Sequence, residues 1–516
     1  MQRRVKSLDA ILATAEKKSL KRSLGPVQLT MLGIGGIIGS GIFVLTAQAA
    51  QKAGPGMIVS FILAAIVCGL AALCYAEIAA MIPVAGSAYT YSYATFGEFF
   101  AWIVGWALVL EYAVAASAVA VSWSGYISGV LDHLLGIHLP HEFIVGPYAG
   151  GIINLPAVFI SLAVTALLVR GTKESASVNA VLVVIKVLAL TMFVILAVPL
   201  IQEARFHPFQ PLGFMGSPGS ALGENGIIGA ASSIFFAFVG FDAVSTAAEE
   251  TKNPQRNVPI GLVASLIICT IFYMLVASGV VGSVGAQPVF GAAHQYLAPG
   301  STALTSACNA IGNTPVVCSN EALAQVLRTL NFPLASSILG LAAGFALPSV
   351  VLMMMYAQTR IFFVMSRDGL LPTSLSKVHS RYRTPHLITL VTGALVTIAA
   401  AFFPVGALAD ISNGGTLCAF FFVGLAVMAL RLKQPERHRP FRTPAVWVIA
   451  PLAVAGCVGL FVFLTPDAKE VFGGWLAAGL VVYFIYGRQN SNVAKGIVES
   501  SDAHPGVAPL GATTPG

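Results

Sequence analysis

The sequence feature that most constrains the fold is a run of five glycines within nine residues, from Gly33 to Gly41, inside a long apolar stretch. A glycine in a helix interior costs about 1 kcal/mol relative to alanine. In lipid, any backbone group freed by unwinding must find a partner inside the protein. The run therefore predicts an interrupted helix whose ends form a ligand site. The alternative is close helix packing, because Gly35 and Gly39 also form a G-x-x-x-G pair.

The composition predicts an all-α polytopic membrane protein. Hydrophobic residues make up 57% of the 516 residues and charged residues only 9%, against about 25% charged in soluble proteins. Apolar runs longer than about 18 residues, enough to cross a bilayer, recur along the chain. A transmembrane barrel would show short alternating strands instead. The net charge of +7 does not indicate nucleic acid, because the basic residues fall where membrane topology places them.

We expect twelve transmembrane spans, most of them separated by Pro, Gly or charged residues. They are expected at about 27–49, 56–81, 97–128, 152–170, 177–198, 226–247, 258–282, 335–364, 386–404, 407–430, 445–464 and 472–488.

Three segments are expected outside the spans. Residues 1–26 are basic and carry a helical apolar period, which predicts a short amphipathic helix on the cytoplasmic surface. Residues 283–334 form a long outer loop whose Cys308 and Cys318 could form a disulfide if the loop faces an oxidising compartment. Residues 489–516 are rich in Gly, Pro, Ser and Asn and are expected to be a disordered cytoplasmic tail.

The basic residues also predict the orientation. With the N-terminus inside, 23 of the 28 Lys and Arg residues lie on the cytoplasmic side and four lie outside. Positive charge favours the cytoplasmic side. We therefore expect a multi-pass protein of the inner (plasma) membrane with both termini in the cytoplasm.

A second interruption is expected five spans after the first, at Phe235-Phe-Ala-Phe-Val-Gly-Phe-Asp242. Because five is odd, a repeat of five helices would enter the bilayer in the opposite direction the second time. Broken helices at matching positions of two inverted halves indicate a transport site. This predicts repeats at 27–198 and 226–430, with helices eleven and twelve at 445–488 outside them.

Broken helices can hold both ends of a zwitterion. Freed N–H groups attract a carboxylate and freed carbonyls attract an ammonium. We expect the N–H groups of Gly39-Ser40-Gly41 to bind the carboxylate and the carbonyls of Ile37, Phe236 and Val239 to bind the amine. The candidate substrate-binding residues are Ile37, Ile38, Gly39, Ser40, Gly41, Phe236, Ala237, Val239, Gly240 and Glu111.

Three further side chains each have two interpretations. Phe236 is a candidate gate over the substrate, or a core aromatic residue. Glu111, in the middle of the third span, faces either the substrate cavity or another helix, since an intramembrane carboxylate is by default a functional hypothesis. Lys186, in the middle of the fifth span, either gains and loses a proton during transport, or is a static amine held by neighbouring carbonyls or a snorkelling side chain. Asp242, nearer a span end, is expected to be a structural cap or rim charge.

Several strings together resemble the amino acid–polyamine–organocation (APC) superfamily, and most closely its bacterial cationic amino acid transporter-like family. The match covers about residues 1–490. The strings are Lys21-Arg-Ser-Leu-Gly25, Gly33-Ile-Gly-Gly-Ile-Ile-Gly-Ser-Gly41, Tyr75-Ala-Glu-Ile78, Pro83-Val-Ala-Gly-Ser-Ala-Tyr-Thr90, Phe238-Val-Gly-Phe-Asp242, Glu249-Glu-Thr-Lys-Asn-Pro-Gln-Arg256 and Ser366-Arg-Asp-Gly369.

The resemblance implies a LeuT-like five-plus-five inverted repeat plus two extra helices, with the site between spans one, three, six and eight. It implies carboxylate binding near Ser40 and Gly41, an aromatic gate at Phe236 and an acidic third-span position at Glu111. In related proton-coupled members a fifth-span lysine takes the place of a sodium ion, and Lys186 resembles that residue. The long outer loop departs from the usual bacterial pattern.

The sequence therefore predicts a permease for proton-coupled uptake of L-amino acids, with the bilayer and protons as its other partners and without a cofactor or metal. Apart from Glu111, the expected side-chain pocket is apolar, which favours small or neutral amino acids. The alternatives are a carrier or exchanger of arginine and lysine, or a non-transporting sensor of the same fold. A membrane enzyme would need a nucleophile–base pair or a metal cluster; zinc at His133, His138 and His141 is the only such candidate.

Overall fold

The computed structural model describes residues 24–84, 86–171, 176–311, 315–379, 382 and 384–495. Apart from two isolated bridges, the regular structure of this part of the chain is helical. The helices are α2 (Pro26–Ile37), α3 (Ser40–Phe43), α4 (Leu45–Ala53), α5 (Met57–Met81), α6 (Ser87–Thr95), α7 (Glu98–Leu135), α8 (Leu155–Arg170), α9 (Ala176–Ala197), α10 (Gly226–Ile234), α11 (Ala243–Thr246), α12 (Pro254–Val284), α13 (Thr302–Asn309), α14 (Ala322–Thr329), α15 (Pro333–Arg367), α16 (His386–Phe402), α17 (Val405–Lys433), α18 (Val446–Val462), α19 (Pro466–Val482) and α20 (Arg488–Asn490).

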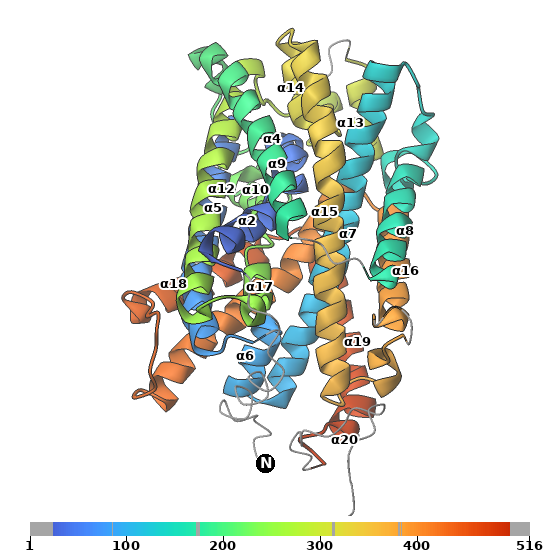
Figure 1. Cartoon of the computed structure of the whole chain (residues 1–516). Coiled ribbons are helices and arrows are strands. Elements are labelled where there is room, and N and C mark those ends of the chain that lie inside the picture. Colours follow the sequence, from blue (N-terminus) through green and yellow to red (C-terminus); the bar gives the residue numbers. More distant parts are fainter. Residues whose placement is uncertain are drawn as a thin grey trace, which may run out of the picture.

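The helices form one bundle with two distinct ends (Figure 1). The short helices α13 and α14 lie at one end, here called the α14 end, and α6 and α20 lie at the other, the α20 end. The long helices α7 and α15 pack against each other and run through most of the bundle. The centre of the bundle lies between these two ends, and it contains the short helices α2 and α10.

The helices identify a polytopic membrane protein. Within the described residues, eight helical segments, some made of more than one labelled helix, are long and apolar enough to cross a bilayer: Leu45–Met81, Glu98–Leu135, Val178–Leu200, Gly226–Thr246, Pro254–Val284, Pro333–Arg367, Val405–Lys433 and Pro466–Asn490. Four shorter apolar helices, α2, α8, α16 and α18, fall in four other predicted spans. Many apolar side chains point outward; Phe159 is 65% exposed, Ile195 64% and Phe345 69%. Such a surface suits lipid.

The segments outside the spans differ partly from expectation. The predicted amphipathic helix falls almost wholly in residues 1–23, outside the described residues. The first residues of the predicted tail, 489–495, are ordered in the structure. Ser491 is fully buried and its hydroxyl donates to Glu98, and the Asn492 amide donates to the Arg367 carbonyl at 2.8 Å. Composition could not reveal these tertiary contacts.

The long loop between α12 and α15 contains α13 and α14 and a disulfide between Cys308 and Cys318. Near this end of the bundle, the buried Lys52 ammonium of α4 lies 3.3 Å from the Asp410 carboxylate of α17. Lys52 also donates to Ser233 of α10 at 2.7 Å. The ion pair and this hydrogen bond together join α4, α17 and α10.

Candidate functional site

The first glycine-rich segment is a broken helix. α2 ends at Ile37, the Ile38 N–H still bonds to the Ile34 carbonyl, and α3 begins only at Ser40. Within the described residues, the N–H groups of Gly39, Ser40 and Gly41 donate to no backbone carbonyl. All of these residues are buried. The break therefore presents free donors inside the protein, as the sequence predicted.

The second predicted break is also present. α10 passes into a 3₁₀ turn, Phe235–Phe238, then Val239 is extended and α11 begins at Ala243. Gly240 has φ of +112°, a conformation that strongly favours glycine because it has no Cβ. The chain thus unwinds for about four residues and resumes as a short helix.

The two breaks touch each other. A Cβ on Gly41 would lie only 2.2 Å from the Ala237 Cα, and a Cβ on Gly36 would lie 3.0 Å from the Gly240 carbonyl oxygen. Carbon atoms in contact normally lie about 3.5–4.0 Å apart. Glycines at these positions let the two backbones approach, so the packing interpretation and the broken-helix interpretation both apply to this segment.

Two side chains from other helices hold the carbonyl end of α2. Lys186 of α9 is 1% exposed and its ammonium donates to the Gly35 carbonyl at 2.8 Å. The Tyr273 hydroxyl of α12 contacts two carbonyls, that of Ile37 at 2.7 Å and that of Ala237 at 2.9 Å. Sequence reasoning missed Tyr273. Tyr273 is the one tyrosine of α12, and that was the only signal.

Two of the carbonyls that were predicted to bind the substrate amine already accept one hydrogen bond each. The Ile37 carbonyl accepts from Tyr273, and the Phe236 carbonyl accepts from the Val239 N–H at 3.1 Å. A carbonyl oxygen has two lone pairs, so each can still accept a second bond. The Phe236 ring itself is 6% exposed.

α15 forms a third wall beside the breaks. A Cβ on Gly39 would lie 3.5 Å from the Val350 side chain. A Cβ on Gly36 would lie 3.1 Å from Met353, and a Cβ on Gly240 would lie 3.2 Å from Met354. The Ser40 hydroxyl is buried and has no hydrogen-bond partner among the described residues. A polar atom in this position usually pairs with water or a ligand.

Glu111 lies against α17. A Cβ on Gly415 would lie 2.9 Å from the Glu111 Cβ, and the Ser412 hydroxyl donates to the Glu111 backbone carbonyl at 3.1 Å. Its side chain is fully buried, and neither carboxyl oxygen has a hydrogen-bond partner in the described part of the chain.

Asp242 is neither a rim charge nor a side-chain cap. It is fully buried at the start of α11 and makes no capping bond. Instead, its carboxyl group accepts from the Tyr112 hydroxyl of α7 at 2.6 Å. Tyr112 directly follows Glu111 and, like it, is fully buried, so α7 contributes a polar partner to the second break. The linear sequence did not indicate this partner.

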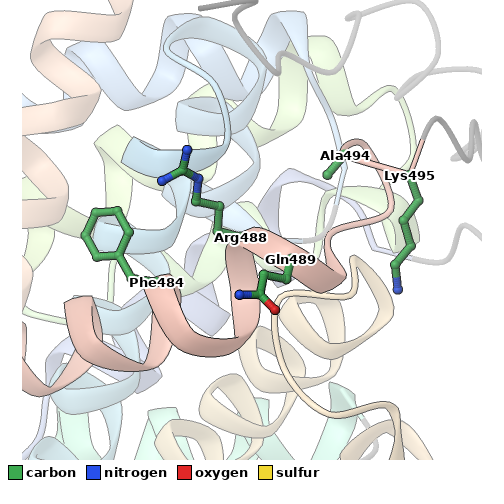
Figure 2. A pocket seen from close by; sticks show the side chains of 5 residues that line it. All are labelled: Phe484, Arg488, Gln489, Ala494 and Lys495. Atoms are coloured by element: carbon green, nitrogen blue, oxygen red, sulfur yellow. The ribbon is translucent and has the colours of Figure 1, made fainter.

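Two other features lie outside this centre. Figure 2 shows a pocket at the α20 end, lined by exposed residues Phe484, Arg488, Gln489, Ala494 and Lys495. Within the described residues, no group of three His, Cys, Asp or Glu side chains could hold a metal ion. His133 and His138 both lie near Asp132 instead.

Comparisons with known proteins show the family of the chain. The family model described as amino acid permease matches residues 24–485. The branched-chain amino acid permease BcaP of Bacillus subtilis (strain 168) is 43% identical over 94% of this chain and 97% of the relative. The methylthioribose transporter of the same organism is 39% identical over 95% and 99%. The vacuolar cationic amino acid transporter 4 of Arabidopsis thaliana is 34% identical over 81% of this chain and 64% of its own length.

The matching family model covers most of the chain, and the relatives are transporters rather than enzymes. The chain belongs to the amino acid permease family of the APC superfamily.

Proposed function

We propose that this permease carries neutral L-amino acids into the cell together with protons, by alternating access across the inner (plasma) membrane. The observation that carries the proposal is the contact between the two broken helices, at Gly41 and Ala237, with free N–H groups beside it. A site of this kind presents opposite partial charges within a few ångströms, which suits a zwitterion.

The proposed fold is twelve spans in a LeuT-like arrangement, with inverted repeats at 27–198 and 226–430 and two further helices at 445–488. The two breaks support it, because they lie five predicted spans apart and yet meet in the structure. The proposed orientation places the α20 end in the cytoplasm, with both termini on that side. The predicted distribution of Lys and Arg supports this orientation.

Substrate binding is proposed at the backbone. The N–H groups of Gly39, Ser40 and Gly41 would hold the carboxylate, with the neighbouring backbone of Ile38 and Gly240 shaping the site. The remaining lone pairs of the Ile37, Phe236 and Val239 carbonyls would hold the ammonium. Phe236 would close over the substrate as a gate.

Lys186 is proposed as the proton-coupling residue. As an ammonium it donates to Gly35, close to the break, and so binds α9 to α2. Loss of its proton would remove the charge that attracts the carbonyl, and α2 could then move away from α9. Burying an ammonium is costly, which makes such a change of charge accessible.

The side-chain pocket favours neutral substrates. Val350, Met353 and Met354 are apolar. Glu111 is the one acidic residue of the proposed site, and its buried carboxyl oxygens have no hydrogen-bond partner among the described residues; it is the group that a cationic side chain would use. The similarity to a branched-chain amino acid permease also supports a neutral substrate. Substrates with a small side chain and substrates with a branched side chain are the two kinds to compare. Arginine and lysine remain the alternative substrates among the amino acids.

Methylthioribose is a second candidate, because a 39% identical relative is named as its transporter. It carries neither a carboxylate nor an ammonium, so it would not use the two poles of the proposed site. A sensor that binds an amino acid without transporting it is the third.

The test is uptake into proteoliposomes of radiolabelled alanine, leucine, arginine and methylthioribose, each with an inward proton gradient and without sodium. We expect accumulation of alanine or leucine that a protonophore abolishes. Accumulation that requires sodium and ignores the proton gradient would contradict the coupling. Preferred uptake of methylthioribose would contradict the zwitterion site, and binding without uptake would indicate a sensor.

A further inference from the structure

The pocket in Figure 2 lies at the end of a membrane-crossing helix. The helical segment Pro466–Asn490 is long and apolar enough to cross a bilayer, and the pocket lies at its α20 end. Three lining residues come from the helix and two, Ala494 and Lys495, come from the chain that follows it. The pocket has a volume of about 410 Å³, within the range of small-molecule sites.

An exposed apolar face of this helix leads to the pocket. Val481, Phe484 and Ile485 are all exposed. Arg488 is exposed as well, and it follows Phe484 and Ile485 at the spacing of side chains that share one face of a helix. An exposed apolar face suits lipid chains, and a cation directly after it suits the charged surface of a membrane.

The chain after the helix brings a second cation to the same pocket. Ser491 is fully buried and its hydroxyl donates to Glu98 at the start of α7. The Lys495 N–H then donates to the Ser491 carbonyl at 3.1 Å, and the Lys495 ammonium donates to the Asn490 side-chain oxygen at 3.3 Å. The fold therefore fixes where Lys495 lies. Because an ammonium has three donors, the bond to Asn490 leaves donors for a ligand.

The chemistry of the lining fits a phosphate group. None of the five described lining residues is acidic. The Arg488 guanidinium matches a phosphate with two parallel donors, and the Lys495 ammonium adds a second positive charge. The Gln489 amide supplies neutral N–H donors beside them. Phe484 makes the remaining wall apolar.

We propose that this pocket binds the head group of an anionic phospholipid, with its phosphate between Arg488 and Lys495 and an acyl chain along Val481 and Ile485. A phospholipid fits better than a soluble phosphate, because the exposed apolar face leads directly to the two cations. The proposal goes beyond amino acid transport. It uses only the proposed placement of the α20 end at the cytoplasmic surface, where anionic lipids attract basic residues.

The experiment titrates dioctanoyl phosphatidylglycerol into the purified full-length protein in neutral detergent and measures bound lipid by native mass spectrometry. We expect binding at least about tenfold tighter than that of dioctanoyl phosphatidylcholine, which has no net charge. Inorganic phosphate at the same concentration should not compete. The double variant Arg488→Gln/Lys495→Gln should lose about 25-fold in affinity for phosphatidylglycerol, about fivefold for each cation.

Lys377→Gln/Arg442→Gln is the matched control, because it also removes two exposed cations. Lys377 follows α15 and Arg442 follows α17, and both helices end beside contacts of the α20 end. We expect this variant to change the affinity for phosphatidylglycerol less than about twofold, because its cations lie outside the pocket. Melting temperatures of both double variants show whether the fold is retained.

Several results would overturn the proposal. Equal losses in the two double variants would show diffuse attraction by surface charge, and equal binding of the two lipids would exclude a site for an anionic head group. Competition by inorganic phosphate would indicate a soluble anion as the ligand. If Arg488→Gln/Lys495→Gln melts well below the control, Lys495→Gln alone decides: a fivefold loss supports the site, and an unchanged affinity contradicts it.

Discussion

Replacing Gly41 with alanine tests whether close contact between the breaks creates the site. The added Cβ would lie 2.2 Å from the Ala237 Cα and 2.5 Å from its Cβ. Since carbon atoms in contact lie at least about 3.5 Å apart, the two breaks must separate by about 1.3 Å. Both neighbours are backbone or Cβ atoms, so no flexible side chain can move aside.

The expected cost follows from this displacement. Overpacking of this kind destabilises a protein by about 1–3 kcal/mol, which lowers the melting temperature by a few degrees and leaves the protein folded. A shift of about 1 Å between groups that position a substrate can reduce the rate about 100-fold. We therefore expect Gly41→Ala to reduce uptake efficiency about 100-fold with modest loss of stability.

Gly69→Ala, in α5 and outside the breaks, is the matched control. No atom lies within 4 Å of a Cβ at this position. We expect its uptake to stay within about threefold of the unmodified protein, since no atoms need to move. The assay is initial uptake of leucine into proteoliposomes, with thermal stability measured alongside. Full activity of Gly41→Ala, or equal losses in both variants, would refute the reasoning.

Three other predictions concern charged groups. Lys186→Met should abolish uptake driven by a proton gradient while leucine binding persists; gradient-driven accumulation at the normal level in this variant would exclude the coupling role. Lys52→Met leaves the buried Asp410 carboxylate without its cation and should cost about 3–5 kcal/mol. The double variant with Asp410→Leu should recover most of the lost thermal stability; failure to recover would show that the unpaired carboxylate is not the cause of the loss. Burial raises the pKa of the Glu321 carboxyl, although Arg328 opposes this shift. The protonated carboxyl therefore contributes stability that is fully present below the unfolded-state pKa of about 4.3. This contribution is lost as the pH rises through the folded-state pKa. The melting temperature of the unmodified protein should therefore fall with rising pH relative to that of Glu321→Gln. Parallel pH profiles of the two melting temperatures would contradict this prediction.

The sequence allowed the interrupted helices to be predicted because glycine is unfavourable in a helix unless the backbone requires it. Gly41 and Gly240 illustrate the two reasons: one allows a close approach and the other adopts a positive φ. Apolar run length likewise predicted the membrane helices, since a span must satisfy its backbone internally.

The partners of buried polar residues could not be predicted in the same way. Tyr273 meets Ile37 across 236 positions of the chain, and Tyr112 meets Asp242 across 130. Such bonds depend on how the helices pack, and one sequence carries no periodic signal for them. For the same reason composition predicted disorder at Ser491, although tertiary contacts bury it.

The most direct test of the zwitterion site is a binding measurement with leucine and two analogues that each lack one pole. Leucine methyl ester lacks the carboxylate charge and 4-methylpentanoate lacks the ammonium. If the two broken helices hold both poles, each analogue should bind the unmodified protein at least about 100-fold more weakly than leucine, about 2.7 kcal/mol in binding free energy. Binding of either analogue as tightly as leucine would show that the pole it lacks is not recognised, and would contradict the central claim.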